Sequence, residues 1–282
     1  MVIDTHTHTF PDKIAAGAVA KLQAAGHTLP FSDGTNAGLA ASMARAGIDA
    51  SVILPVATNI HQVPHVNDNA ARVNDRGSET GLYSFGCIHP DTPDWKEELG
   101  RIASLGLKGI KLHPAYQAAN FDDLRYLRIL DRAGELGLIV LTHAGVDIGL
   151  PSPVYCTPEM VLNALNQVGP VKLVLAHMGG WRQWDQVEEL LTSAPVYLDT
   201  AFSFGPITPA PDATFSPDEL NMMGQAQFLR FVQKFGAHRL LFGTDSPWGD
   251  QAADVKRIQA LPLSQAEKDA ILGGNAQQLL GI

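Results

Sequence analysis

Short runs of apolar and β-branched residues alternate along the chain with longer amphipathic segments. Each run has the length of a buried strand, and the segments between them carry apolar residues at helical spacing. We expect eight strands, at Val2–Thr5, Ser51–Pro55, Leu82–Ile88, Gly109–Leu112, Leu138–Thr142, Val171–Ala176, Val196–Asp199 and Leu240–Gly243. The expected helices include Leu39–Ala46, Val66–Arg76, Trp95–Leu105, Leu124–Leu136, Pro158–Val168, Val187–Thr192 and Gln225–Phe235.

Alternating strands and helices predict an α/β fold with a parallel sheet. Eight such units in 282 residues match the count of a closed (β/α)8 TIM barrel. A doubly wound open sheet is the structural alternative, but it offers no reason for functional residues to end so many strands. The chain has no linker-like stretch, repeat or low-complexity segment, so we expect one domain over residues 1–282.

Three stretches between the expected elements are long: Thr9–Gly38, Ala144–Thr157 and Ala201–Gly224. In a barrel they would all follow strands and lie at the carboxyl-terminal face, where active sites are built. Long loops in this position form lids or specificity walls, or they are merely tolerated insertions.

Composition narrows the class of partner. The formal net charge is -9, from 20 basic and 29 acidic residues, and no run of Lys or Arg favours nucleic acid or an anionic membrane. No apolar stretch has the about 18 residues of a membrane span, and the first motif leaves no room for a signal peptide. Cys87 and Cys156 form no spacing pattern, so we expect free cysteines and a cytoplasmic protein. The partner we expect is a small-molecule substrate, and a homo-oligomer is left open.

The first candidate site residues are His6 and His8, at the end of the first expected strand. Residues i and i+2 of a strand point to one face. The two imidazoles would therefore project side by side and could bind one metal ion.

Other polar side chains stand where later strands end. Five strands deliver candidates to one rim: His6, His8, Lys111, His143, His177 and Asp245. Imidazole and carboxylate bind zinc and similar ions. An ion with an open position lowers the pKa of its water from about 15.7 toward about 7. Asp245 is then the candidate base for that water's proton, and His177 is placed to stabilise a developing oxyanion.

These motifs resemble the amidohydrolase superfamily, and within it amidohydrolase family 2, a branch of metal-dependent hydrolases. The resemblance rests on Ile3–His8, Gly109–Pro114, Thr142–Gly145, Ala176–Gly180, Gly243–Pro247 and the terminal Gly273–Gly281. It implies a distorted (β/α)8 barrel. In one-metal members the ligands would be His6, His8, His143 and Asp245, with His177 catalytic. In two-metal members His143 and His177 would hold the second ion, and a carboxylated Lys111 would bridge the pair.

The branch is mostly mononuclear, so we expect one divalent ion per chain, zinc in the first instance, with two as the alternative. Strand alternation places Lys111 on the same face as Gly109 and His113. A buried ammonium there must be carboxylated, paired with an acid or in contact with an anionic substrate.

Several residues after strand ends are candidates for substrate binding: Lys111, His113, Tyr116, Trp181 and Trp248. Loop packing is the alternative for each aromatic residue. Asp199, at the end of the seventh strand, could support a ligand histidine.

The resemblance leaves two reactions open. The first is hydrolysis of a lactone, ester or amide carbonyl in a small organic substrate. The second is non-oxidative decarboxylation of an aromatic or unsaturated carboxylic acid. A non-enzymatic metal-binding role is a third reading, but it would not need an open metal site with a base beside it.

Overall fold

The computed structural model describes residues 1–282, which form two compact units. The first unit comprises Met1–Val52, Ile148–Leu150 and Asp199–Ile282, and the second comprises Ile53–Asp147 and Pro151–Leu198. The chain thus crosses between them several times. Each unit is described by itself below.

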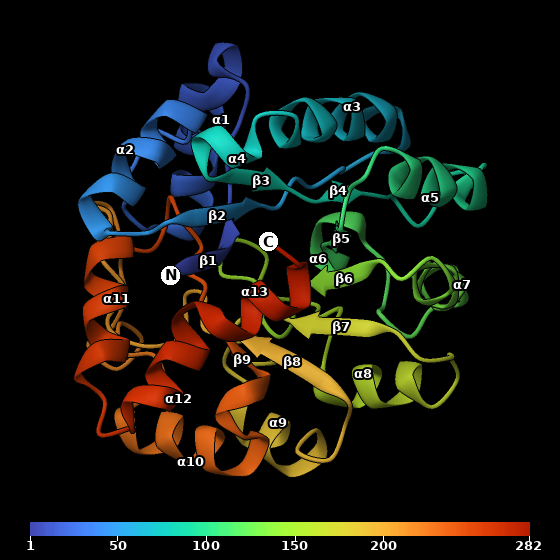
Figure 1. Ribbon diagram of the computed structural model, residues 1–282. Coiled ribbons are helices and arrows are strands. Elements are labelled where there is room, and N and C mark those ends of the chain that lie inside the picture. The colour runs from blue at the N-terminus through green and yellow to red at the C-terminus, as the bar shows by residue number, and fades with distance from the viewer. The chain divides into compact units, whose positions relative to one another are not determined.

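The second unit is built on parallel strands that follow one another in chain order (Figure 1). β4 (Gly86–Cys87) pairs with β5 (Gly109–Leu112), β5 with β6 (Ile139–Thr142), β6 with β7 (Lys172–Leu175), and β7 with β8 (Val196–Asp199). Parallel strands need a crossover between each pair. The carboxyl ends of these strands therefore share one edge, where the loops that follow them begin.

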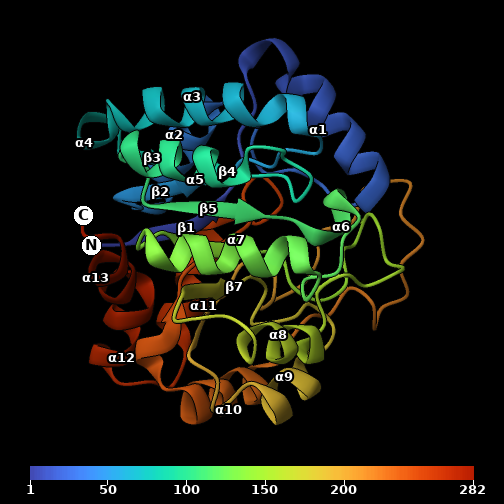
Figure 2. The same ribbon diagram turned by 90° about the vertical axis from the view of Figure 1, so that its right-hand side faces the viewer.

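Helices connect and cover these strands. They are η1 (Ile60–Gln62), α3 (Val63–Asn74), α4 (Gly77–Thr80), α5 (Trp95–Ser104), α6 (Pro114–Gln117), α7 (Leu124–Glu135), α8 (Pro158–Leu165) and α9 (Trp184–Leu190). The first three, η1, α3 and α4, precede β4 in the chain, and α5 to α9 lie between β4 and β8. Figure 2 shows α3, α5 and α7 running along the strands. α7 buries Tyr126, Leu127, Ile129, Leu130 and Ala133, the three- and four-residue spacing of an amphipathic helix.

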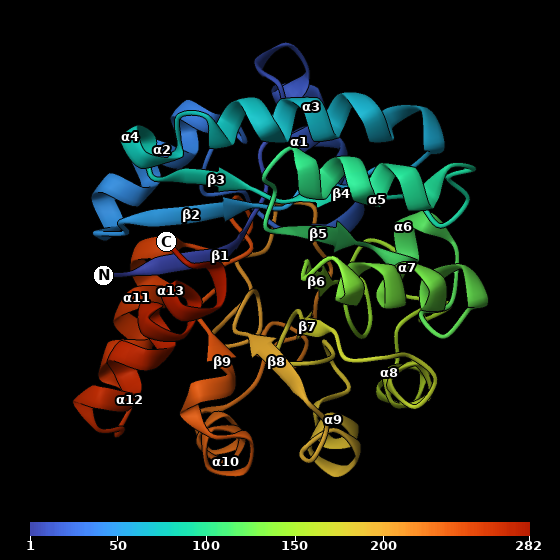
Figure 3. The same cartoon turned by 45° about the vertical axis from the view of Figure 1, so that its right-hand side comes forward.

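The first unit contains the two chain ends, which lie near each other beside β1 and α13 (Figure 3). Its strands are β1 (Ile3–Thr7), β2 (Ala50–Ile53, whose last residue belongs to the second unit) and β9 (Leu240–Leu241). Its helices are α1 (Asp12–Gly26), α2 (Asn36–Ala46), α10 (Gln225–Phe235), η2 (Ala237–Arg239), α11 (Gln251–Ala260), α12 (Gln265–Asp269), η3 (Ala270–Gly274) and α13 (Asn275–Leu280).

The prediction of a parallel α/β fold is confirmed, and every expected strand is present in whole or in part. The expected strand Leu82–Ile88 is divided into β3 (Leu82–Ser84) and β4. The division has a hydrogen-bonding cause, because the Phe85 amide donates to the Ile53 carbonyl whereas the next residue, Gly86, is paired with Ile110 of β5. The strand changes partner at this point.

The prediction that Thr9–Gly38 is a loop was wrong, because the stretch contains the 15-residue helix α1. This segment is rich in alanine, which favours helix through its backbone propensity while producing only weak apolar periodicity. The other two long stretches, Ala144–Thr157 and Ala201–Gly224, contain no helix or strand.

Cys87 and Cys156 are free thiols, and both are buried. No helix combines the length and the apolar character that crossing a membrane requires.

Candidate metal centre

Three side chains of the first unit converge on one point. His6 Nε2 lies 3.2 Å from His8 Nε2 and 3.4 Å from Asp245 Oδ1, and His8 Nε2 lies 3.1 Å from the same oxygen. The His6 side chain is 1% exposed, whereas those of His8 and Asp245 are 19% and 14% exposed. The structure therefore brings together three of the four ligands that the sequence predicts, and two of the three are partly exposed.

Backbone pairing between two distant segments creates this convergence. The Thr5 amide donates to the Phe242 carbonyl at 2.8 Å, the Asp245 amide to the His6 carbonyl at 2.8 Å, and the His8 amide to Ser246 at 2.6 Å. The β1 strand thus runs beside residues 242–246. Because alternate strand residues share a face, His6 and His8 meet Asp245 on the same side.

The spacing of the three atoms can be compared with that of metal ligands. Ligand atoms about 2.0–2.1 Å from one ion at tetrahedral angles lie about 3.3–3.4 Å apart. Ligands about 2.2 Å from an ion at right angles lie about 3.1 Å apart. The observed separations of 3.1–3.4 Å cover both values, so the spacing of these residues fits that of ligands to a divalent ion.

The protonation of His6 suits a metal ligand. Its Nδ1 lies 2.8 Å from Asp199 Oδ2, and the Asp199 side chain is fully buried. A carboxylate accepts the Nδ1 proton, which leaves Nε2 of the neutral ring with its lone pair facing His8 and Asp245. The second Asp199 oxygen accepts from the Ala201 amide at 3.1 Å. The geometry is thus that expected for Asp199 as the support of a ligand histidine.

A second cluster lies within the second unit, at the ends of β5 and β6. Asp147 Oδ2 lies 3.5 Å from His113 Nε2 and 3.9 Å from His143 Nε2. His177 Nε2 lies 3.0 Å from His143 Nδ1, a hydrogen-bonding distance. All four side chains are buried. These separations are wider and less regular than those of the first cluster. The ligand atoms of His113, His143 and Asp147 nevertheless lie within 4.8 Å of one another, so this group is a second candidate for holding a metal ion.

Two of the predicted catalytic residues have an unusual backbone. His177 has a φ of 60° and Asp245 a φ of 64°, in the left-handed region that residues other than glycine rarely adopt. The His177 carbonyl is held by the Trp184 indole Nε1–H at 3.0 Å and by the Gly180 amide at 3.3 Å. Strained non-glycine residues of this kind cluster at functional sites.

Lys111 occupies the third position of β5, and it is only 1% exposed. Its Cα is paired with Cys87 on one side and with Leu141 on the other. The lysine is therefore buried within a strand, as the sequence predicts, and it stands two residues before His113 of the second cluster.

The predicted aromatic contacts divide between the units. Tyr116 stacks on His113, with ring centroids 4.0 Å apart and an interplanar angle of 7°. Trp181 is 7% exposed and carries the Arg182 guanidinium 4.7 Å above its ring. Trp248 is half-buried in the first unit, and its amide donates to the Asp245 carbonyl at 2.8 Å. Tyr116 thus adjoins the histidine cluster of its unit, and Trp248 adjoins a predicted ligand.

Two carboxylates of these clusters were missed by sequence reasoning. Asp147 stands four residues after His143 in an irregular stretch without a periodic signal. Asp4 stands two residues before His6 and is fully buried, and this burial raises its pKa to about 6 while hydrogen bonds from Gln251, Thr244 and His6 lower it. An acidic residue within the expected buried strand Val2–Thr5 is the signal that could have identified Asp4.

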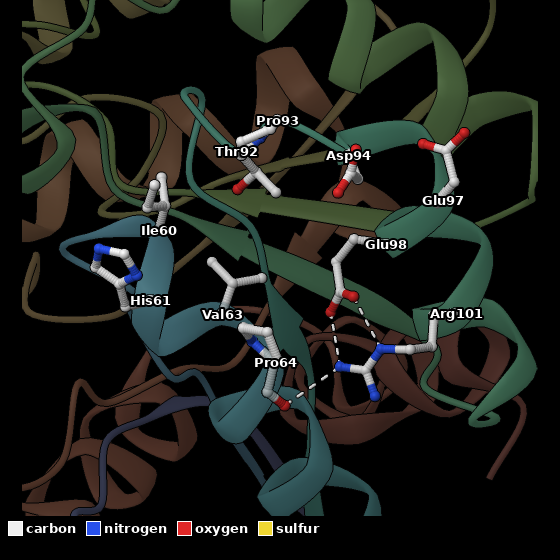
Figure 4. Close-up of a pocket in the computed structure, with 10 residues that line it drawn as sticks. All are labelled: Ile60, His61, Val63, Pro64, Thr92, Pro93, Asp94, Glu97, Glu98 and Arg101. Atoms are coloured by element: carbon white, nitrogen blue, oxygen red, sulfur yellow. Dashed lines mark hydrogen bonds and ion pairs between the residues drawn. The ribbon is translucent and has the colours of Figure 1, made fainter.

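A groove of about 430 Å³ lies elsewhere in the second unit, between the start of α3 and the segment Thr92–Arg101 (Figure 4). Arg101 donates to both oxygens of Glu98 at 2.8 Å along one of its walls. None of the predicted ligands or substrate contacts lines this groove. We therefore do not place the candidate site there.

Parallel βα units with His and Asp side chains clustered at or near strand ends are typical of metal-dependent α/β enzymes. A sequence model described as amidohydrolase matches residues 3–282, nearly the whole chain. The chain belongs to this family, amidohydrolase family 2, as its motifs predict. No curated protein matches the chain.

Solved structures show the fold. An uncharacterised TIM-barrel protein from Bordetella bronchiseptica is 20% identical with a TM-score of 0.76, covering 99% of this chain and 98% of its own. A putative 2-pyrone-4,6-dicarboxylic acid hydrolase from Pseudomonas putida is 18% identical (TM-score 0.67; 99% and 97% covered). A dihydroxybenzoic acid decarboxylase from Polaromonas, with bound manganese and 2-nitroresorcinol, is 15% identical (TM-score 0.66; 99% and 96% covered). The likeness to these proteins confirms the (β/α)8 barrel.

Proposed function

We propose that this chain is a metal-dependent hydrolase that cleaves a lactone, ester or amide carbonyl of a small organic substrate. The triangle of His6, His8 and Asp245 carries the proposal, because its edges of 3.1–3.4 Å are those of ligands around one divalent ion. Membership of amidohydrolase family 2 supports it.

His6, His8 and Asp245 would hold the ion, and the resemblance adds His143 as a fourth ligand. When bound, a divalent ion polarises a carbonyl oxygen and lowers the pKa of water toward neutrality. Zinc is the ion we propose, one per chain. Manganese is the alternative, because it is the ion named with the Polaromonas decarboxylase.

The chain's own residues would then move the protons. The partly exposed carboxylate of Asp245 is a corner of the triangle, and it would accept a proton from water and pass it to the leaving group. His177 has a positive φ, and its ring is oriented by the 3.0 Å contact between its Nε2 and His143 Nδ1. We assign it the role of stabilising negative charge on the substrate oxygen.

Decarboxylation is the second candidate. The Polaromonas protein is a decarboxylase, and the P. putida protein is a putative hydrolase of a dicarboxylic acid. Both names involve substrates with carboxylate groups. A buried Lys111 and the His113–Tyr116 stack are the residues to which we assign contact with such a substrate, together with Trp181 and Trp248.

Product analysis separates the two reactions. The purified protein would be incubated in ¹⁸O-water with a panel of lactones, esters, amides and aromatic carboxylic acids. Hydrolysis incorporates ¹⁸O into the product acid, whereas decarboxylation releases carbon dioxide with no gain of oxygen. Asp245→Asn should lose either activity, and Asp12→Asn, which removes one exposed acid of α1, should retain it. Full activity in Asp245→Asn as well as in Asp12→Asn would contradict the proposal.

A further inference from the structure

The carboxylate of Asp4 accepts four hydrogen bonds inside the first unit. Oδ1 accepts from the His6 amide at 3.1 Å and from the Thr244 amide at 3.0 Å. Oδ2 accepts from Thr244 Oγ1 at 2.5 Å and from Gln251 Nε2 at 2.8 Å. Asp4 is completely buried. A carboxylate offers about four acceptor positions, so this one is saturated.

The donors come from both segments that carry the proposed ligands. His6 is itself one ligand, and Thr244 immediately precedes another, Asp245. Gln251 is the first residue of α11, and its side chain is 1% exposed. Asp4 thus ties the β1 strand, residues 242–246 and the start of α11 to one point, two residues before His6 on the strand.

This arrangement is more than ordinary strand pairing requires. Backbone bonds already join β1 to residues 242–246, and an apolar side chain at position 4 would suit the buried strand. Burial of a carboxylate is unfavourable unless its partners compensate for lost water. Here both amides, the amide side chain and the hydroxyl donate to it, so the site is arranged for a negative charge close to the proposed cation.

We propose that Asp4 is a positioning residue that sets the spacing between the β1 ligands and Asp245. It does not touch the ion, and it acts through the backbone of His6 and through Thr244. This inference rests on the proposed function, because it presumes that a divalent ion binds at His6, His8 and Asp245.

The test is metal affinity in Asp4→Asn. Asparagine keeps the shape of the side chain. Its NH2 group would, however, face groups that donate hydrogen bonds to the Asp4 carboxylate, and it cannot accept from them. Zinc affinity of chelator-stripped protein would be measured by competition with a chromophoric chelator. We expect a 10- to 100-fold weaker affinity, the usual effect of losing a residue behind a ligand. The absorption bands of the cobalt-substituted variant should also change, because they report ligand geometry.

Asn275→Ala is the matched control. The Asn275 side chain donates to the Ala237 and Leu240 carbonyls, both at 2.7 Å, so its loss weakens the same unit without touching Asp4. We expect lower thermal stability with unchanged zinc affinity and cobalt spectrum. Thr244→Val replaces Asp4→Asn as the test if that variant does not fold, because it removes one hydrogen-bond donor to Asp4. We expect its zinc affinity to be weaker by about 3- to 10-fold.

The outcomes separate the two proposals. Unchanged affinity in Asp4→Asn, or in Thr244→Val if only that variant folds, would overturn the role of Asp4 while leaving the metal site intact. An equal loss of affinity in Asn275→Ala would also overturn it, because general weakening of the unit would then explain the effect. Failure of the unmodified protein to bind zinc or manganese would overturn the proposed function itself, and the role of Asp4 with it.

Discussion

Nδ1 of His6 lies 2.8 Å from Oδ2 of Asp199, and both side chains are buried. The residues are far apart in sequence: His6 is the fourth residue of β1, and Asp199 is the last residue of β8 and belongs to the first unit. Their contact sets which nitrogen of His6 carries the proton, and it turns the other nitrogen toward His8 and Asp245. The orientation of a proposed ligand is therefore determined by a residue outside the ligand set.

We predict that Asp199→Asn weakens zinc binding by about 10- to 100-fold. An amide in this place can donate to Nδ1, which favours the tautomer that places the proton on Nε2. Competition with a chromophoric chelator measures the affinity. A variant that binds zinc as tightly as the unmodified protein would show that this hydrogen bond does not orient His6.

His177→Asn should separate catalysis from metal binding. Asparagine tolerates a positive φ better than most residues, so the backbone at φ 60° should persist. We expect turnover to fall by at least about 100-fold, while zinc content stays at the unmodified level. Elemental mass spectrometry and an activity assay on the same preparation check this. Full turnover would exclude a catalytic role, and loss of the ion would make His177 a ligand.

The carboxamide of Gln117 should be a major source of stability in the second unit. Its Nε2 donates to the Ala57 and Ile88 carbonyls at 3.0 and 2.8 Å, and its Oε1 accepts from Tyr126 Oη at 2.6 Å. Gln117→Leu keeps the volume but leaves these buried groups unpaired. We expect the free energy of unfolding to fall by about 2–4 kcal/mol, measured by urea denaturation.

Tyr126→Phe is the control for that prediction. It removes one bond to Gln117 and leaves the carboxamide paired with both carbonyls. The free energy of unfolding should fall by only about 1 kcal/mol. Equal losses in the two variants would mean that the carbonyls find other partners.

The stability of the second unit should decrease as pH falls below about 6.5, the ordinary pKa of histidine. Burial lowers the pKa of His89, with a further contribution from Arg125 and opposition from Asp91. The Asp91 amide donates to His89 Nδ1 at 3.2 Å, which requires that nitrogen to be unprotonated. The unfolded chain therefore binds more protons in this range, and stability decreases with falling pH.

His89→Asn should reduce this sensitivity, because asparagine can accept the Asp91 amide but cannot be protonated. The measurement is the difference in melting temperature between pH 7.5 and pH 5.5. His61→Asn, at an exposed histidine of η1, is the control and should leave the difference unchanged. The prediction fails if His89→Asn shows the same pH dependence as the unmodified protein.

The sequence predicts strand ends better than it predicts helices of low periodicity. β5 and β8 begin and end where the apolar runs do, since a buried strand in a parallel sheet is a continuous apolar segment. α1 was not expected, because alanine promotes helix without marking a face. The periodic apolar pattern by which the other helices were predicted is weak in this segment, so the helix was not predicted.

The site shows a similar division. His6 and His8 follow from strand alternation, and Asp199 follows from its place at a strand end. The positive φ of His177 and Asp245 and the position of Asp147 depend on tertiary contacts. Asp4 was not expected because its four donors come from segments distant in sequence or from backbone amides. No single stretch of sequence shows such a convergence.

The most direct test of a metal centre at His6, His8 and Asp245 is elemental mass spectrometry on protein purified without chelator and then dialysed against zinc. We predict about one tightly held divalent ion per chain in the unmodified protein. His6→Ala and Asp245→Ala should retain almost none, whereas Asp12→Asn should match the unmodified protein. Equal metal content in all four proteins, or none in the unmodified protein, would contradict this site.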